Sequence, residues 1–432
     1  MRIKRVTALV ALTALAVAAL VATSTAGAKT KHRGVSGSIA VTGVWTGQEE
    51  QNFQAVIDGF TKANPDVKVK YTSSGDQTPT VLSTAVAGGN PPDLAAVSQP
   101  GLMKDFASRG ALKPIDFAKG VIAKNYTPSW STLGSVKGHL YGLFFKGANK
   151  STVWYNVKAF KNAGVKPPAT WPALLKAAKT LRASGTPAYA IGGADGWTLT
   201  DLFENIYLRS AGAAKYDLLT NHKIKWTDAS VKAALKLMAQ VLSDTGNIPG
   251  GKPGALQTDF ATSVDEVLNA TPKAAMIFEG DFVPGVSKSG SKALTDYNVF
   301  AFPKIGASPP SVVGGGDIVM MFKDTPAARA FVSYLATSEA ASIWAAKGGF
   351  SSPNKNVKAS TYTDPLNRST AIALSHASTF RFDLSDLQPA AFGGTVGQGE
   401  FKIFQDFLKN PKNVNGIAAA LEKSAAAAYK KK

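Results

Sequence analysis

The residues best suited to chemistry in this sequence follow short apolar runs and combine carboxylates, amides and indoles with glycine. The stretch VWTGQEE follows the run SIAVTG and carries Trp45, Gln48 and Glu49. Comparable stretches supply the other candidates, namely Asp76, Gln99, Trp197, Asp201, Glu279, Asp281, Gly314, Gly315, Gly316 and Asp317. Indoles offer flat apolar faces, whereas carboxylates and amides offer fixed hydrogen-bonding groups. Sugars match this mixture, because a sugar ring has an apolar C–H face and hydroxyl groups at its edge.

Each of these signals also has a purely structural interpretation. Trp45 could pack in a loop, and Glu49 could cap the helix that follows it. The three consecutive glycines before Asp317 could form only a flexible turn. Asp281 and Asp317 could cap helices or loops. The recurrence of the mixture at several turns is what favours a binding site.

The elements that must position these residues alternate between strands and helices. Residues 38–44 are typical of a strand, and residues 67–71 alternate apolar and polar side chains as a strand does. Between them, Thr46 and Glu49 are spaced as a capping box before an amphipathic helix. We therefore expect a parallel βαβ unit, in which ligands bind beyond the carboxyl ends of the strands.

Further strands are expected at residues 188–193, 274–278, 297–303 and 317–322, and helical patterns lie between them. The "GGGD" stretch is expected as a turn that leads into the last of these strands. Together these patterns predict an α/β fold with two domains.

Composition excludes several classes of chemistry. The 432 residues contain no Cys and four scattered His, so a zinc cluster, a thiol nucleophile or a disulfide cannot be built. We expect no metal and no cofactor. The net charge of +19 suggests an anionic surface as a neighbour, but the Lys residues are dispersed and form no basic helix with interleaved aromatics. Nucleic acid is therefore not expected as a partner.

The N-terminal residues have the layout of a secretory signal peptide. Arg2, Lys4 and Arg5 precede an apolar run over residues 6–22, and AGA at residues 26–28 is a small-residue cleavage site. We expect residues 1–28 to be this signal, with an uncleaved membrane anchor as the alternative. The remainder is expected to be exported to a periplasm or cell surface. Without Cys it cannot be a lipoprotein anchored through that residue, so its mode of retention stays open.

Longer segments of the chain resemble the extracellular solute-binding proteins of bacterial carbohydrate ABC importers. The segments that carry the resemblance are VWTGQEEQNFQAVIDGFTKANPDVKVKY, VAGGNPPDLAAVSQPGLMKDFASRGALKPID, GHLYGLFFKGANKSTVWYNVKAFKNAGVKPPATWPALLKAA, VVGGGDIVMMF and AFVSYLATSEAASIWAAKGGFSSPN. The motifs SQPG, NKSTVWYN, GGGD and FRFDLSDLQPAAFG are most similar to the α-glucoside-binding branch.

The resemblance implies a two-lobed fold with a sugar cleft between the lobes and three chain crossings at the hinge. It places residues 29–145 and 303–348 in the first lobe, and residues 146–302 and 349–432 in the second. The ligand-binding residues that it implies are Trp45, Gln48, Glu49, Asp76, Gln99, Asn149, Trp197, Asp281, Gly315, Gly316, Asp317, Arg381 and Asp383. It also implies a monomer that binds a sugar, delivers it to membrane permease subunits and has no enzymatic activity.

Two residues receive specific roles under this interpretation. The indole of Trp45 is expected to be partly solvent-facing without ligand and to stack on one glucose ring. Asp317 is expected to accept hydrogen bonds from two adjacent hydroxyls, with the backbone of Gly315 and Gly316 against the ring. Two other functions stay open: a binder of peptides or polyamines, and an exported glycosidase with paired carboxylates.

Overall fold

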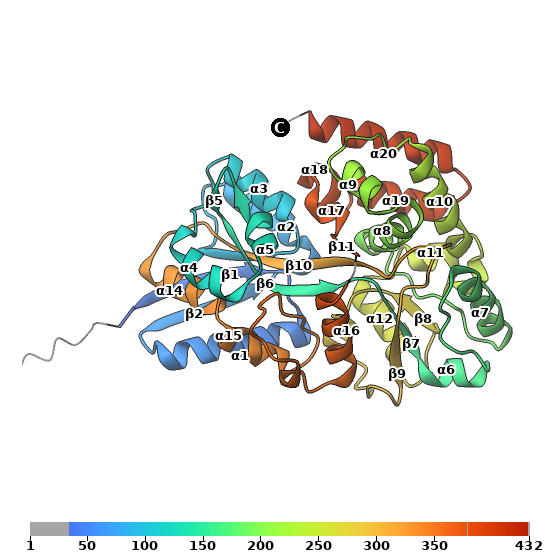
Figure 1. The fold of residues 1–432 in the computed structure, drawn as a ribbon, viewed down its shortest axis with the longest axis horizontal. Coiled ribbons are helices and arrows are strands. Elements are labelled where there is room, and N and C mark those ends of the chain that lie inside the picture. The colour runs from blue at the N-terminus through green and yellow to red at the C-terminus, as the bar shows by residue number, and fades with distance from the viewer. Residues whose placement is uncertain (1–33, 378, 431–432) are drawn as a thin grey trace, which may run out of the picture. The chain divides into compact units, whose positions relative to one another are not determined.

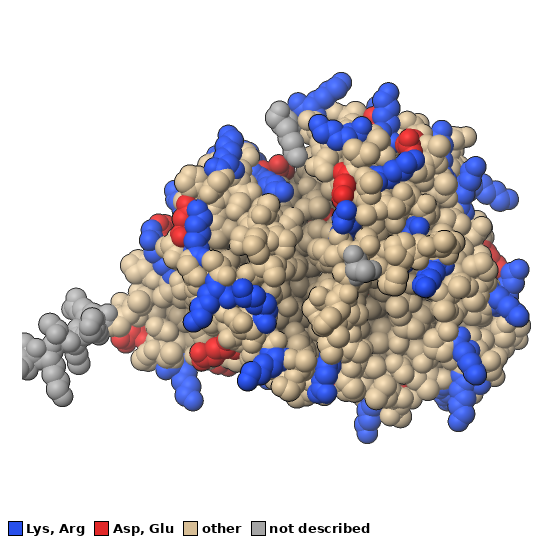
Figure 2. Space-filling model, viewed as in Figure 1, with Lys and Arg blue, Asp and Glu red and all other residues tan. Residues whose placement is uncertain are grey.

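The computed structural model describes residues 34–377 and 379–430. The expected signal peptide at residues 1–28 lies outside the described residues. Among the residues that are described, no helix is both long and apolar enough to cross a membrane. Lys and Arg side chains are dispersed over the face shown in Figure 2 and do not gather in one patch.

The expected βαβ unit is confirmed at the start of the described chain. Strand β1 (Gly37–Gly43) and strand β2 (Val67–Ser73) pair in parallel, and helix α1 (Gly47–Ala63) connects them. The helix forms because Phe53, Val56, Ile57 and Phe60 recur at helical spacing and are buried together on one face. The expected capping box is wrong, because Thr46 occupies the N-cap position but its side chain makes no capping hydrogen bond.

The larger sheet has six strands in the order β11-β10-β3-β1-β2, with β6 also paired to β10. Its further strands are β3 (Leu94–Val97), β6 (Gly142–Asn149), β10 (Ser311–Met321) and β11 (Thr379–Phe382). Strand β10 runs antiparallel to β3 and β6 and parallel to β11. Figure 1 shows β6 and β10 side by side, and these two long strands supply residues to the site described below.

Two groups of helices contribute to the apolar cores beside this sheet. The first group follows β2 along the chain and consists of α2 (Thr78–Ala87), α3 (Pro100–Ser108), α4 (Lys119–Asn125) and α5 (Pro128–Leu133), with the short strands β4 (Ser135–Val136) and β5 (His139–Leu140). The second group follows β10 and consists of α14 (Pro326–Leu335) and α15 (Ser338–Ala345). One core joins α1, α14 and α15, and a smaller one includes α3. Burial of these apolar faces is the main force that holds the helices to the sheet.

The smaller sheet has three antiparallel strands, in the order β8 (Met276–Phe278), β7 (Thr152–Asn156) and β9 (Tyr297–Ala301). The helices of this region are α6 (Val157–Asn162), α7 (Trp171–Ala183), α8 (Trp197–Ala211), α9 (Ala213–Thr220), α10 (Ala229–Leu242), α11 (Gly251–Ala255), α12 (Phe260–Leu268) and α13 (Val283–Val286). The C-terminal helices are α16 (Pro365–Ser375), α17 (Leu384–Leu387), α18 (Ala390–Gly393), α19 (Gly399–Lys409) and α20 (Val414–Tyr429). The strand expected at residues 188–193 is wrong, since only an isolated bridge from Tyr189 to Met276 forms there.

The "GGGD" stretch is not a turn but the middle of strand β10, which corrects the expectation from the sequence. Glycine is required because other groups occupy the space that side chains would need. A Cβ atom on Gly314 would overlap with the Phe380 ring, and one on Gly316 would lie 2.7 Å from the Lys146 carbonyl oxygen. The pairing of β10 with β6 shifts register between Asp317 and Ile318. A bulge of this kind changes the direction of a side chain and is common beside functional sites.

Only Lys150 and Ser151 separate β6 of the larger sheet from β7 of the smaller one. The chain therefore passes from one sheet to the other with almost no connecting loop. The residues assigned above to each lobe stay a prediction.

Candidate functional site

A cavity of about 380 Å³, here called the first cavity, is lined by residues from both sheet regions. The larger sheet and its connections supply Trp45, Glu49, Asp76, Ser98, Gln99, Lys146, Gly316 and Asp317. The region of the smaller sheet and the C-terminal segment supply Lys150, Asp195, Trp197, Asp259, Phe260, Phe282, Ser385 and Asp386. The volume falls within the range of small-molecule sites, which are roughly 300 to 1,000 Å³.

Trp45 is a buried part of the wall, and its indole is not a solvent-facing platform. The side chain is 0% exposed and packs among Phe53, Tyr71 and Trp344. Its indole N–H donates a hydrogen bond of 2.6 Å to Asp317 Oδ2. The expectation of a partly solvent-facing indole is therefore wrong. The sequence pattern missed the burial because the aromatic neighbours come from distant parts of the chain.

Asp317 is held by donors from three directions. Besides the indole of Trp45, Ser98 Oγ donates to Asp317 Oδ1 at 2.7 Å. The ammonium group of Lys146 lies 3.8 Å from Oδ2. Both carboxylate oxygens thus already have protein partners, although each retains further acceptor capacity. The side chain thus links β10 to the residue that follows β3 and to the turn that precedes α1, at the wall of the cavity.

A buried ion pair lies beside Asp317. The Lys146 ammonium donates to Glu49 Oε1, and both side chains are almost fully buried. Burial raises the pKa of Glu49, and Lys146 opposes that shift. For Lys146, burial lowers the pKa, but the nearby carboxylates of Glu49 and Asp317 raise it by more. The net shift of the pKa is therefore upward. The ammonium group of Lys146 is thus directed at Glu49 and Asp317 and away from a ligand.

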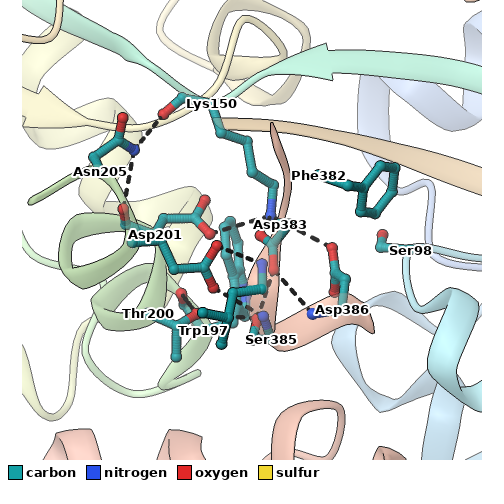
Figure 3. A network of polar contacts seen from close by, with 12 residues as sticks. Ser98, Lys150, Trp197, Thr200, Asp201, Asn205, Phe382, Asp383, Ser385 and Asp386 are labelled. Atoms are coloured by element: carbon teal, nitrogen blue, oxygen red, sulfur yellow. Dashed lines mark hydrogen bonds and ion pairs between the residues drawn. The ribbon is translucent and has the colours of Figure 1, made fainter. Parts of the chain in front are cut away.

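Lys150 is the centre of a second buried network, shown in Figure 3. Its ammonium group lies 2.5 Å from Asp383, 3.1 Å from Asp201 and 3.7 Å from Asp386. Burial opposes the charge of Lys150, but these three carboxylates raise its pKa well above the usual value. Burial also disfavours ionisation of Asp383, yet Lys150 lowers its pKa below the usual value. Asp383 is therefore the ionised partner of Lys150.

Helix α8 places several of these groups by its repeat. Trp197, Asp201, Asn205 and Arg209 are four residues apart, so they follow one face of the helix. Gly196 is the N-cap residue immediately before the helix; it adopts a φ of 85°, and a Cβ there would lie 2.8 Å from Phe401 Cβ. Glycine is thus needed at the turn that directs Trp197 into the cavity.

The aromatic face of the first cavity consists of Trp197, Phe260 and Phe282. The ring centroids of Trp197 and Phe260 are 4.8 Å apart, and those of Phe260 and Phe282 are 5.7 Å apart. The indole N–H of Trp197 also lies 3.3 Å from Asp76 Oδ2. Trp197 is half-buried, unlike Trp45. It is therefore the indole that can present a face to a ligand.

Acceptors outnumber donors around this aromatic face. Asp195 accepts the backbone N–H of Phe260 at 2.6 Å. Burial raises the pKa of Asp195 to about 6, and the nearby Asp76 adds to this shift. The buried Oε1 atom of Gln99 has no hydrogen-bond partner among the described residues. A ligand that donates several hydrogen bonds would satisfy these groups.

Seven of the thirteen predicted ligand-binding residues line this cavity: Trp45, Glu49, Asp76, Gln99, Trp197, Gly316 and Asp317. The other six lie outside the lining: Gln48, Asn149, Asp281, Gly315, Arg381 and Asp383. The ligand contacts themselves stay predictions. Four of the seven, Trp45, Glu49, Asp76 and Gln99, follow strands β1, β2 and β3, whose carboxyl ends meet at one edge of the larger sheet.

Three of the six residues have partners that explain their positions. Asp281 is fully buried and accepts a hydrogen bond from Ser351 Oγ. Arg381 forms a two-point ion pair with Asp217, at 2.5 and 2.8 Å. Asp383 is bound to the Lys150 network described above.

The remaining three are placed by their local structure. Gln48 is exposed and donates to Asn52 Oδ1 at 3.0 Å. Gly315 lies within β10, where a Cβ would be 2.9 Å from Lys150 Cε. Asn149 ends β6 and lines a different cavity.

Sequence reasoning missed both buried lysines, Lys146 and Lys150, and the carboxylates Asp195, Asp259 and Asp386. A usable signal was present in GLFFKGANK, where Lys146 interrupts a largely apolar and glycine-rich strand and Lys150 follows it directly. Lysine is rarely buried without a partner, so such a strand indicates carboxylates nearby. Within residues 34–377 and 379–430, no group of three or more His, Asp or Glu is placed to hold a metal ion.

Comparison with known proteins identifies the class. Residues 46–342 match the family model of the bacterial extracellular solute-binding proteins, and the chain belongs to this family. It is 33% identical to the osmoprotective compounds-binding protein GgtB of Synechocystis, over 84% of this chain and 86% of that protein. It is 32% identical to the alpha-glucosides-binding periplasmic protein AglE of Rhizobium meliloti, over 90% of this chain and 86% of that protein.

Solved structures confirm the two-lobed α/β fold. The bacterial solute receptor AcbH superposes with a TM-score of 0.81 at 20% identity, over 91% of this chain and all of that chain. RafE in complex with raffinose superposes with a TM-score of 0.72 at 18% identity, over the same shares of the two chains. At such identities the likeness concerns the fold. The first cavity lies where residues of both sheet regions meet.

Proposed function

We propose that this chain is the extracytoplasmic substrate-binding component of an ABC sugar importer and that it captures an α-glucoside-type mono- or oligosaccharide in the first cavity. The observation that carries the proposal is the combination of a half-buried aromatic face with an excess of acceptors. Trp197, Phe260 and Phe282 would pack on the C–H face of a sugar ring. Asp76, Asp195 and Gln99 would accept hydrogen bonds from its hydroxyl groups.

The charges of the first cavity support a neutral ligand with many donors. Lys146 and Lys150 are both engaged by carboxylates within the protein. An anionic ligand would therefore meet no free lysine and would face several carboxylates. A neutral sugar avoids this repulsion and offers O–H donors to the same groups. The name of AglE, an alpha-glucosides-binding protein, agrees with such a ligand, and GgtB is named for binding osmoprotective compounds.

Capture would proceed by closure of the two lobes around the sugar. The chain would be exported by its N-terminal signal, act at a periplasm or cell surface as a monomer, and pass the sugar to permease subunits. Closure would remove water from the cavity and strengthen each hydrogen bond to the carboxylates. The short connection between β6 and β7 is a suitable place for the required rotation.

One observation favours a second candidate, a binder of polyamines. Six carboxylates line the first cavity, namely Glu49, Asp76, Asp195, Asp259, Asp317 and Asp386, against the two lysines. A diammonium ligand would be attracted by that excess. The aromatic face would also accept a cation. A glycosidase remains a third outcome, because the cavity holds several carboxylates.

A thermal-shift panel separates these functions. Maltose and trehalose are compared with cellobiose, galactose, spermidine and a tripeptide at equal concentration. The proposal expects the α-glucosides to raise the melting temperature most, because a ligand that binds only the folded state stabilises it. A larger shift with spermidine than with any sugar would favour the polyamine binder. Chromatography of the sugars after incubation would reveal glucose if the protein were a glycosidase.

A further inference from the structure

A second cavity of about 730 Å³ lies on the other side of the segment that joins the two sheets. Along this segment, Ala148 and Lys150 line the first cavity, whereas Asn149 and Ser151 line the second. The alternation is that of an extended chain, whose successive side chains point to opposite sides. The two cavities therefore share one wall but are separate spaces.

The second cavity contains a buried guanidinium group without a carboxylate partner. Arg209, the last of the four residues along the face of α8, is 8% exposed and lines the cavity. Its Nη1 atom donates to Asn205 O at 3.2 Å and Oδ1 at 3.0 Å, and its Nη2 atom donates to Ser311 O at 2.7 Å. No carboxylate of the described residues forms an ion pair with it. Burial accordingly lowers its pKa to about 10.

Such a group is unusual, because burying a charge without a counter-charge destabilises the folded state. The carbonyl oxygens and the Phe302 ring, whose centroid is 4.7 Å from the guanidinium carbon, offset only part of that cost. Its hydrogen bonds run from Nη1 and Nη2, and the Nε–H of Arg209 has no acceptor within residues 34–377 and 379–430. An anion in the cavity would supply the missing counter-charge.

The rest of the lining has the matching character. Lys304 and His376 are exposed basic residues at the cavity, and its described lining contains no Asp or Glu. Most of the wall is apolar, formed by prolines and by side chains such as Phe300 and Val312. This chemistry is opposite to that of the first cavity, where carboxylates predominate.

We propose that the second cavity is a binding site for a small organic carboxylate with an apolar body. The carboxylate would contact Arg209, whose planar guanidinium group suits two-point recognition of such an anion. The apolar body would lie against Phe300, Phe302 and Val312. Lys304 and His376 at the opening would attract the anion from solution.

The site is connected to the first cavity through Asn205. Its Oδ1 atom accepts from Arg209 and from Ser151 Oγ, and its Nδ2 atom donates to the Lys150 carbonyl oxygen at 2.8 Å (Figure 3 shows the last contact). Two hydrogen bonds, from Arg209 to Asn205 and from Asn205 to Lys150, therefore connect an occupant's binding partner in the second cavity to the first cavity. The proposal does not depend on which solute the first cavity takes.

Calorimetric titration with benzoate tests the site, with benzamide as the neutral control of the same shape. We expect saturable binding of one benzoate, and an affinity for benzamide that is at least tenfold weaker. Equal affinities, or no binding of benzoate at millimolar concentration, would overturn the proposal. Benzoate that binds only in proportion to concentration, without saturation, would equally count against a built site.

Three variants, Ala373→Phe, Ile372→Phe and Lys304→Glu, locate the binding without removing Arg209, whose loss could unfold the protein. Ala373→Phe adds a ring at an exposed position of α16 in the cavity lining and should abolish benzoate binding. Ile372→Phe, at the neighbouring residue outside the lining, is the matched control and should bind normally. Lys304→Glu should weaken binding several-fold. Loss of binding in Trp197→Ala instead, with Ala373→Phe unaffected, would place the benzoate in the first cavity and refute the assignment.

Discussion

Trp197 is the residue whose exposure and surroundings best suit contact with a sugar. Its indole is half-buried, faces Phe260 and Phe282, and borders the first cavity. Trp197→Ala should weaken α-glucoside binding by roughly 1 to 3 kcal/mol, which is about fivefold to more than a hundredfold, since a large apolar contact is lost. Trp197→Phe retains an aromatic face but removes the N–H that lies near Asp76, so it should lose less affinity.

Calorimetric titration of both Trp197 variants measures these losses, and thermal melting verifies that they fold. Normal affinity in Trp197→Ala would contradict a stacking role. Equal losses in the two variants would instead assign the effect to the N–H group.

Trp45 is expected to respond differently because it is fully buried. Trp45→Ala should lower the free energy of unfolding by about 3 to 5 kcal/mol, the range for removing a large aromatic from a core. It also removes the N–H donor to Asp317. Trp45→Phe, which retains a ring in the cluster, should cost less. Urea unfolding measures both, and a Trp45→Ala variant with unchanged stability would refute the packing that we describe.

Asp195 should produce a pH dependence at the cavity. Burial raises its pKa from 3.8 to about 6, so between these values the folded state binds more protons than the unfolded state. The contribution of Asp195 to stability is therefore largest below pH 4 and is lost as the pH rises through 6. Relative to Asp195→Asn, the wild type should become less stable between pH 5 and pH 7. Unfolding curves at both pH values test this, and a difference that stays constant would contradict the shift.

At the scale of elements, strand β10 needs its glycines because neighbouring residues occupy the space that side chains would fill. Gly314→Ala would force a methyl group into the Phe380 ring on β11, and overpacking typically costs about 1 to 3 kcal/mol. Gly120→Ala is the matched control, because Gly120 lies in helix α4 with open space around it. The control should be neutral or slightly stabilising. Thermal melting compares them, and equal melting temperatures would show that β11 adjusts freely.

The elements also show how far the sequence could be interpreted. The β1–α1–β2 unit was predictable because its signals are local: an alternating strand, an amphipathic face and turn residues between them. The role of Gly314–Gly316 was not, because glycine is used there for close approach of Phe380 and Lys146, which are distant in sequence. The same limit explains Trp45, whose aromatic neighbours include Trp344.

At the first cavity, the sequence indicated which residue types gather there better than it indicated which residues contact each other. Asp317 was correctly placed near Trp45, but its partners Ser98 and Lys146 could not be inferred from turn patterns. The buried lysines have no periodic signature of their own. Their carboxylates come from segments as distant as Asp201 and Asp383, which only the folded chain brings together.

For the whole molecule, we expect ligand-driven closure. The first cavity is lined from both sheet regions, so a sugar that contacts both sides favours the closed arrangement. Small-angle scattering should show a smaller radius of gyration with a saturating α-glucoside than without it. A sugar that produces no thermal shift is the control and should leave the profile unchanged. An identical profile at saturation with the binding sugar would argue against closure.

The central claim is that the first cavity binds an α-glucoside without altering it. Calorimetric titration with maltose and trehalose, followed by chromatography of the recovered sugar, tests that claim most directly. We predict saturable binding of one sugar molecule with a submillimolar or smaller dissociation constant. Trp197→Ala should bind the sugar more weakly, and the sugar should be recovered intact. Absence of binding to either sugar together with tight binding of spermidine, or release of glucose, would contradict the account.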